Sequence, residues 1–246
     1  VDRLGIFGIA LALLAIIGGN ALEGGEFEQL LNLPAALIVV GGTIAAAAIQ
    51  TPAQDFGRAL WWLKHLFGDV MPDRYQGLER LTHWCGLARK NGLLGLESQA
   101  DQESDEFTRA GLQLLIDGSN LESLRASLEI EMISREQRDL KAAKVLDSMG
   151  GYAPTLGIVG AVLGLVHVLG NLSQPEELSA GIATAFIATI YGVALANLLL
   201  IPLANRIRSI VQARYQYQEM VLEGLLLIAD GKTPQALHQR LRGYLV

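Results

Sequence analysis

The chain has 246 residues, of which 51% are hydrophobic and only 18% are charged, and its mean hydropathy is +0.33. This composition favours a membrane protein with a soluble part. The net charge of −6 and the absence of a basic run argue against nucleic-acid binding, and the single cysteine, Cys85, excludes a disulfide framework or a multi-cysteine metal site.

Two apolar segments open the sequence. The first, Leu4–Leu22, is about as long as a membrane span, and a secretory signal has a shorter apolar core of about 7–15 residues. We therefore expect a retained transmembrane helix. The second segment, residues 33–50, carries Pro34 where the first turn of a helix accepts it. The connection between them, residues 23–32, contains glutamates and no Lys or Arg.

The next segment, residues 51–149, is soluble in composition and helical in period. RALWWLKHLFGDV predicts an amphipathic helix with two tryptophans, for which an anchor at the membrane surface and plain core packing both remain open. Helix ends are expected at Asn91-Gly92 and Asp117-Gly118. The rest is predicted to be mainly helical up to the next apolar segment. A helical layer continuous with a span would transmit rotation or tilt.

Two further apolar segments lie between Gly150 and Pro202, joined by the acidic turn SQPEEL. Each is about long enough to cross a hydrocarbon core, and neither contains Asp, Glu, Lys or Arg. An amphipathic helix is expected after Pro202, ending at Asp230-Gly231, followed by a short helix or a frayed tail.

All 19 basic residues lie at the N-terminus, between Thr51 and Gly150, or after Pro202. The positive-inside rule therefore places both termini and the central segment in the cytoplasm and the two acidic turns outside. We predict an all-α protein with four spans and a helical cytoplasmic domain between spans two and three. Its segments are a transmembrane hairpin 1–50, a cytoplasmic domain 51–149, a second hairpin 150–205, and a cytoplasmic helix and tail 206–246.

Enzyme signatures are absent from the sequence, which has no P-loop, no GxSxG elbow and no HExxH. The four histidines occur singly, without metal-ligand spacing. We therefore expect no catalysis, no metal site and no cofactor. His167 lies inside span three near its outer end, and we interpret it as a neutral side chain facing the interface.

Small residues form a stripe on each of the last two spans: Gly157, Gly160, Ala161 and Gly164 on span three, and Ala185, Ala188, Thr189, Gly192 and Ala196 on span four. Such stripes let helix backbones approach closely in lipid, and ordinary packing explains most of these positions. For Thr189, a bond to its own i−4 carbonyl and a place beside a polar pathway both remain open.

Two prolines interrupt these spans near their cytoplasmic ends. Pro154 and Pro202 each remove one helical hydrogen bond, which would free the carbonyls of Gly150 and Leu198. Two breaks at one depth would form either a flexible exit or a simple bend at the membrane surface. We favour the functional interpretation because two helices share the depth.

These stretches resemble the MotA/PomA/MotC family of flagellar stator subunits, most closely its PomA/MotC branch. GGYAPTLGIVGAVLGLVHVL resembles the third span of that branch, and ATAFIATIYGVALANLLLIPLANRI resembles the fourth. ARKNGLLGLE and GLQLLIDG resemble the cytoplasmic segment, and VDRLGIFGIALALLAIIGG and LIVVGGTIAAAAI the opening hairpin. The likeness therefore spans nearly the whole chain.

The resemblance implies a multi-pass subunit of the bacterial inner membrane that forms a ring, a pentamer, around a dimer of MotB-type partners. An aspartate on the partner's span accepts the permeating ion, which fits the absence of a carboxylate from spans three and four. Ion flow turns the ring, and the cytoplasmic domain pushes on the rotor protein FliG. Arg89, Lys90 and Glu97 fall on the rotor-facing charged positions, although a solvated helix face would look the same.

The resemblance also assigns the membrane positions. Pro154 and Pro202 fall on the two prolines that couple ion flux to rotation. The implied lining of the ion pathway consists of Gly157, Ala161, Gly164, Ala188 and Thr189, with Thr189 facing the partner's aspartate. Sodium-driven members carry threonines where this chain has Ala161 and Ala188. Because sodium needs several oxygen ligands and a proton does not, the two alanines favour protons.

Three alternatives remain. A TolQ/ExbB-like energising subunit also uses a partner's aspartate, but it lacks the opening hairpin. A self-contained channel or transporter would usually carry its own intramembrane charge. In a purely structural scaffold, the two prolines and Thr189 would be incidental.

Overall fold

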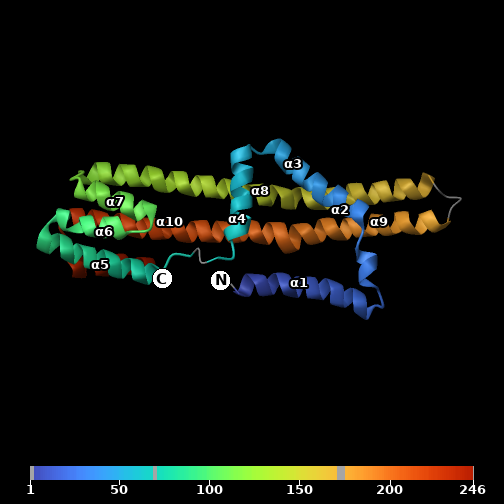
Figure 1. The fold of residues 1–246 in the computed structure, drawn as a ribbon, viewed down its shortest axis with the longest axis horizontal. Coiled ribbons are helices and arrows are strands. Elements are labelled where there is room, and N and C mark those ends of the chain that lie inside the picture. The colour runs from blue at the N-terminus through green and yellow to red at the C-terminus, as the bar shows by residue number, and fades with distance from the viewer. Residues whose placement is uncertain (1–2, 69–70, 171–174, 246) are drawn as a thin grey trace. The chain divides into compact units, whose positions relative to one another are not determined.

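The computed structural model describes residues 3–68, 71–170 and 175–245, and within these ranges the chain forms helices and no strand (Figure 1). Its internal contacts divide it into two compact units, Val1–Val70 with Leu140–Arg208 and Met71–Asp139 with Ser209–Val246. Helices α8 (Leu121–Gly170) and α10 (Ile201–Ala229) contribute residues to both units. Residues 51–70 and 140–149 thus group with the apolar helices.

The first unit holds the apolar helices. Besides its parts of α8 and α10, it contains α1 (Arg3–Leu22), a 3-10 turn (Phe27–Leu30), α2 (Leu33–Ala36), a π-helical segment (Leu37–Gly41), α3 (Gly42–Gln50), α4 (Ala53–His65), α9 (Pro175–Ala194) and a second π-helical segment (Leu195–Leu200). Within the described residues, four helices are long and apolar enough to cross a membrane: Leu4–Leu22, Phe27–Gln50, and stretches of Leu121–Gly170 and Leu178–Ala229. The four predicted spans are confirmed.

The outward surfaces of these helices are apolar. Leu14 on α1 is 68% exposed, Ile158 on α8 is 59% exposed and Phe186 on α9 is 70% exposed. Water disfavours continuous apolar surface of this kind, whereas lipid solvates it. The chain is therefore a membrane protein.

The second unit is built around a conventional core. Its helices, besides its parts of α8 and α10, are α5 (Arg74–Asn91), α6 (Glu97–Gln102), α7 (Glu106–Ile116) and α11 (Pro234–Leu241), with 3-10 turns at Leu93–Leu96 and Arg242–Leu245. The buried side chains in this core include Leu81, Trp84, Phe107, Leu128, Met220 and Leu241. Cys85 is also buried and donates its thiol hydrogen to the carbonyl of Lys232 at 3.3 Å, so it is a packed core residue.

The predicted helix ends are confirmed, and their geometry explains them. Gly92, Gly118 and Gly231 have φ values of 75°, 76° and 68°, and each follows the last helical residue or the residue after it. At the end of α7, Gly118 N–H bonds to Leu115 O and Ser119 N–H bonds to Leu114 O. This pattern satisfies the last carbonyls of a helix and needs a left-handed residue, which glycine adopts without strain.

Two features of the last spans differ from the simplest expectation. The predicted acidic turn covers residues 173–178, of which 173 and 174 lie outside the described ranges. Helix α9 already begins at Pro175, inside that predicted turn, because proline is well suited to a helical first turn. Near Pro154, α8 continues without a break, whereas the segment just before Pro202 is π-helical.

Candidate functional sites

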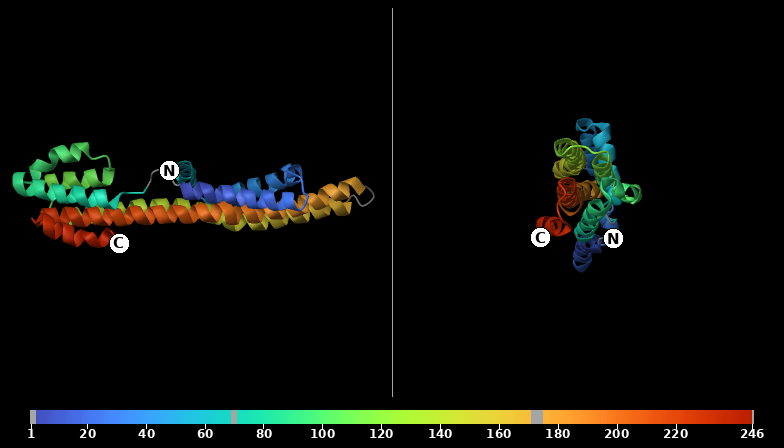
Figure 2. Two further views of the ribbon diagram at one scale, coloured as in Figure 1. Left: turned by 90° about the horizontal axis from the view of Figure 1, so that it is seen from below. Right: turned by 90° about the vertical axis from the view of Figure 1, so that its left-hand side faces the viewer.

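Spans three and four pack backbone against backbone. Helices α8 and α9 lie side by side in both views (Figures 1 and 2). A Cβ atom added to Gly157 would lie 2.9 Å from the carbonyl oxygen of Ala188, and one added to Gly164 would lie 2.7 Å from that of Gly181. Glycine is therefore required at these two positions for the observed helix separation.

The implied lining residues of the ion pathway occupy different environments within this chain. Gly157 and Gly164 are buried between α8 and α9, and Ala188 is fully buried in a small cluster with Ala35 and Val39. Ala161 is partly exposed and Thr189 is exposed. The structure thus brings the small residues together as a packing surface and leaves two of the five positions open to a neighbouring chain. Their place beside an ion pathway stays a prediction.

Thr189 shows one of the two behaviours that its sequence position allowed. Its hydroxyl donates to the carbonyl of Ala185 at 3.2 Å, a bond within its own helix. The hydroxyl oxygen keeps lone pairs that can accept a second hydrogen bond. Because Thr189 is an exposed residue, its hydroxyl can accept a hydrogen bond from a partner without losing its own helical contact.

A close contact between Gly150 and Ile201 lies near the two predicted coupling prolines. A Cβ atom added to Gly150, whose carbonyl faces the missing N–H of Pro154, would lie 2.7 Å from Cγ1 of Ile201, the residue before Pro202. In the π-helical segment that ends there, Ile201 N–H donates to the carbonyl of Ala196, five residues back. Such segments are rare and often occur at functional sites.

An ion pair lies next to this contact. The Arg208 guanidinium is 2.9 Å from the Asp147 carboxylate, which links α10 to α8 just beyond the prolines. Both side chains are more than a third exposed, so the pair contributes only about 0–1 kcal/mol to the stability of the fold. Its main effect is to hold α10 beside α8.

A polar cluster that attaches the start of span two to span four was not predicted from the sequence. The Tyr191 hydroxyl on α9 accepts a hydrogen bond from Asn32 N–H at 3.2 Å and donates to the carbonyl of Leu30. The Asn32 side chain donates to the Thr184 hydroxyl at 2.9 Å and caps α2 by accepting from Ala35 N–H. The available signal was a tyrosine inside an apolar span and an asparagine two residues before Pro34.

The predicted rotor-facing residues lie on one corner of the second unit. Arg89 and Lys90 are exposed in the last turn of α5, and Glu97 is exposed at the first position of α6. Between them, the turn Leu93–Leu96 reverses the chain, so that α6 returns alongside α5. The structure therefore brings the three charges into one region, and their contact with a rotor stays a prediction.

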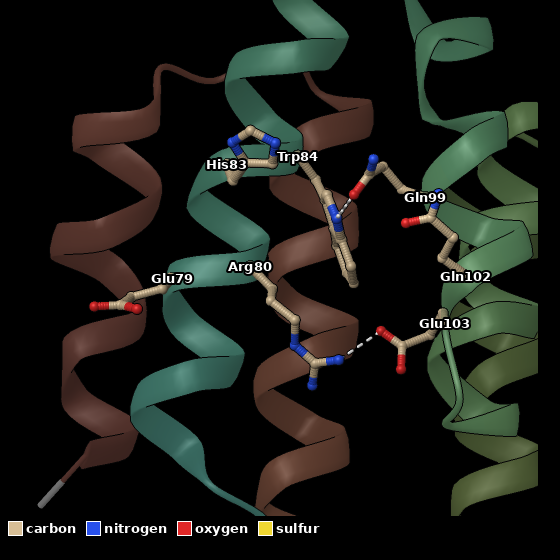
Figure 3. A pocket seen from close by; sticks show the side chains of 7 residues that line it. All are labelled: Glu79, Arg80, His83, Trp84, Gln99, Gln102 and Glu103. Atoms are coloured by element: carbon tan, nitrogen blue, oxygen red, sulfur yellow. Dashed lines mark hydrogen bonds and ion pairs between the residues drawn. The ribbon is translucent and has the colours of Figure 1, made fainter.

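Two hydrogen bonds join α5 to α6 and to Glu103, the residue that follows α6 (Figure 3). Arg80 Nη1 lies 2.7 Å from Glu103 Oε2, and Trp84 Nε1 donates to Gln99 Oε1 at 3.3 Å. The Glu103 side chain is only 2% exposed. Arg80 Nη2 also donates to the Tyr217 hydroxyl at 2.6 Å, and burial raises the pKa of Tyr217. This network holds α6, and with it Glu97, against the core.

A cleft of about 390 Å³ lies beside this network. It is lined by Glu79, Arg80, His83, Trp84, Gln99, Gln102 and Glu103. Across the described ranges, no group of three or more His, Cys, Asp or Glu side chains is placed to hold a metal ion. His83, like the exposed His167 on α8, belongs to no such group.

Comparison with known proteins identifies the family to which this helical membrane protein is similar. The profile of the MotA/TolQ/ExbB proton channel family matches residues 99–220, and that of the motility protein A N-terminal family matches residues 6–91. Motility protein A of Bacillus subtilis is 32% identical over 249 aligned positions, which cover 100% of this chain and 91% of the relative.

Two solved structures extend the likeness to the fold. The structure of C. jejuni MotAB matches with a TM-score of 0.94 and 30% identity, over 100% of this chain and 96% of that chain. The flagellar MotAB stator complex from Bacillus subtilis matches with a TM-score of 0.92 and 32% identity, over the same shares of each chain. The chain therefore belongs to the motility protein A family.

Proposed function

We propose that this chain is the MotA-type subunit of a flagellar stator. With a MotB-type partner it forms an ion channel in the bacterial inner membrane, and ion flux through that channel generates torque on the rotor. The chain-long match to MotAB stator structures carries this proposal. The chain supplies helices and no carboxylate within spans three and four, so the ion-accepting group belongs to the partner. We expect no catalytic activity and no cofactor.

The subunit works in a ring, for which we propose five copies by family resemblance. The large exposed apolar side chains of α8 and α9, such as Ile158 and Phe186, need cover from lipid, neighbouring copies or the partner's span. The opening hairpin, matched by the motility protein A N-terminal profile, supports a stator subunit over a TolQ/ExbB-like one.

Both termini and the second unit face the cytoplasm in this proposal. This orientation is supported by the distribution of Lys and Arg. The two short acidic connections contain none of them, and basic residues favour the cytoplasmic side. Cysteines introduced at Glu26 and at Lys232 of a Cys85→Ala variant would test it. An impermeant maleimide should label position 26 from the periplasm and position 232 only after lysis.

The translocated ion is a proton in our proposal. Ala161 and Ala188 offer no hydroxyl ligand, and Ala188 is fully buried, which supports a pathway without a dedicated sodium site. Swimming should therefore persist without sodium and stop when the proton gradient is collapsed. Motility that required sodium and ignored the proton gradient would contradict this assignment.

Co-purification with a candidate MotB-type partner, followed by structure determination in a nanodisc, tests the whole proposal. We expect a ring of this chain around the partner's spans, with Thr189 facing the partner's aspartate. Conductance should require both proteins. Ion conductance from the purified chain alone would instead support a self-contained channel.

A further inference from the structure

Helix α4 has an orientation unlike that of the spans beside it. It follows α3 directly, after the short connection at residues 51–52, and runs crosswise to α3, α8 and α9 within the same unit (Figures 1 and 2). Because α3, α8 and α9 cross the membrane, a helix crosswise to them at the end of a span lies along the membrane surface. Amphipathic helices bind membranes in this orientation.

The two faces of α4 differ in a way that fits this position. Ala59, Trp62 and, just beyond the helix, Leu66 are at most 2% exposed and pack into the unit. On the outward face, Leu60 is 56% exposed and Trp61 is 38% exposed. The adjacent tryptophans, indistinguishable in the sequence, thus have opposite environments: Trp62 is a core residue and Trp61 faces outward.

The side chains of Arg58 and His65 lie against the outward tryptophan. The Arg58 guanidinium lies 4.6 Å from the centre of the Trp61 ring, and the His65 ring stacks on the same indole at 4.4 Å. Lys64 is exposed in the last turn, and Asp55 is the only acidic residue of α4. Beyond the helix, Arg206 donates to the carbonyl of Leu66 at 3.4 Å and adds a further positive charge to this region.

We propose that the outward face of α4, formed by Arg58, Leu60, Trp61 and Lys64, binds the headgroups of anionic phospholipids in the cytoplasmic leaflet. Leu60 enters the acyl boundary, the indole of Trp61 lies at headgroup depth, and the two cations pair with phosphate groups. This contact fixes the depth at which span two leaves the membrane. It rests on the proposed orientation of the chain, since the cytoplasmic leaflet carries the anionic lipid.

The test uses the full chain with its MotB-type partner in nanodiscs of phosphatidylcholine and phosphatidylglycerol. Only one of the two lipids carries bromine, placed near the top of its acyl chains, where it quenches a nearby indole. The difference between the natural chain and Trp61→Phe isolates the Trp61 signal from the other two tryptophans. We expect Trp61 to be quenched more by brominated phosphatidylglycerol than by brominated phosphatidylcholine.

Charge removal should abolish this preference. In the double variant Arg58→Gln/Lys64→Gln, the preference should fall by about five-fold for each charge removed. The matched control, Lys232→Gln/Arg240→Gln, removes the same charge from the second unit and should leave the preference unchanged. If the double variant fails to fold, the natural chain decides the question, because added salt should weaken the preference by screening.

Two outcomes would overturn the proposal. Absence of Trp61 quenching by either lipid would mean that protein, such as a neighbouring copy, covers this face. Equal quenching by both lipids, insensitive to salt, would mean an interfacial helix without anionic recognition. The stator proposal is tested separately by co-purification of the natural chain with its partner. If the two proteins do not co-purify, the stator proposal fails, whatever the lipid measurement shows.

Discussion

Gly150 lies so close to Ile201 that a Cβ atom on the glycine would be 2.7 Å from Cγ1 of the isoleucine, whereas a Cβ atom on the next residue, Gly151, would meet nothing within 4 Å. This contact lies between Gly150, four residues before Pro154, and Ile201, the residue before Pro202. If the two prolines work as one hinge, the separation of the helices at this contact is part of that hinge.

The neighbouring glycines provide a matched pair of variants. Gly150→Ala must displace a branched side chain near its root, which costs about 1–3 kcal/mol by overpacking. Gly151→Ala adds only helix propensity, worth about 1 kcal/mol in favour of folding. We expect Gly150→Ala to lower the melting temperature of the purified complex and reduce swimming, and Gly151→Ala to retain both. Equal behaviour of the two variants would contradict a role for this contact.

The sequence predicted the helices well, because helix ends and span lengths depend on neighbouring residues in the chain. The glycines that end α5, α7 and α10 act through their own backbone conformation, and span lengths follow from apolar runs. Contacts between distant segments left no such signal. Trp61 and Trp62 have the same local pattern, and only the packing of α4 separates them.

In the candidate sites, too, local features were predicted and contacts between distant segments were not. Small-residue stripes predicted close packing of spans three and four, but they did not show that Ala188 is buried while Thr189 is exposed. The bond from Asn32 to Tyr191 joins residues 159 positions apart, so the local sequence around either residue does not predict it. The π-helical segment before Pro202 likewise departs from the period on which helix prediction rests.

Tyr191→Phe should loosen the attachment of the opening hairpin to span four. It removes the partner of two backbone groups, Asn32 N–H and Leu30 C=O, at a cost of about 1–3 kcal/mol when those groups are left unsatisfied. Thermal unfolding of the purified protein measures the loss. Tyr152→Phe is the control, because its hydroxyl bonds to Gln50 on an exposed surface. A larger loss in the control would show that the Tyr191 bonds contribute little.

Ala161 and Ala188, where the resemblance implies threonines in sodium-driven members, should respond differently to an added hydroxyl. Ala188 is 0% exposed, and its Cβ already lies 2.6 Å from the position of a Cβ on Gly160. Ala188→Thr should therefore destabilise the protein by about 1–3 kcal/mol. Ala161→Thr, at a partly exposed position, should be tolerated. Unchanged stability of Ala188→Thr together with a new sodium dependence of swimming would place Ala188 on the pathway instead.

Arg80→Met tests the network that holds α6 against α5. The substitution keeps a long apolar stem but leaves the Glu103 carboxylate, 2% exposed, without its cation. Removing one partner of a buried pair costs about 3–5 kcal/mol, and the 35% exposure of Arg80 puts this case at the low end. Arg125→Met, which removes an exposed i,i+4 pair with Glu129, should cost under about 0.5 kcal/mol. The predicted rotor contact should weaken with the first variant, because Glu97 loses its support.

Tyr217 should make the second unit sensitive to alkali. Burial, together with the nearby carboxylates of Asp105 and Glu103, raises the pKa of Tyr217, and this outweighs the opposing effect of Arg80. The folded state thus holds the phenol proton more tightly than the unfolded state does. Stability is unaffected below the ordinary tyrosine pKa of about 10 and falls as the pH rises above it.

Urea unfolding of the detergent-solubilised protein at several pH values measures this loss. Tyr217→Phe lowers stability at neutral pH, because Arg80 loses a hydrogen bond, but it should flatten the decline above pH ~10. Tyr75→Phe, at a side chain that is 67% exposed, should leave the alkaline slope unchanged. If stability falls equally steeply with pH in the Tyr217→Phe variant and in the natural chain, other groups cause the alkaline loss and the ionisation of Tyr217 does not contribute to it.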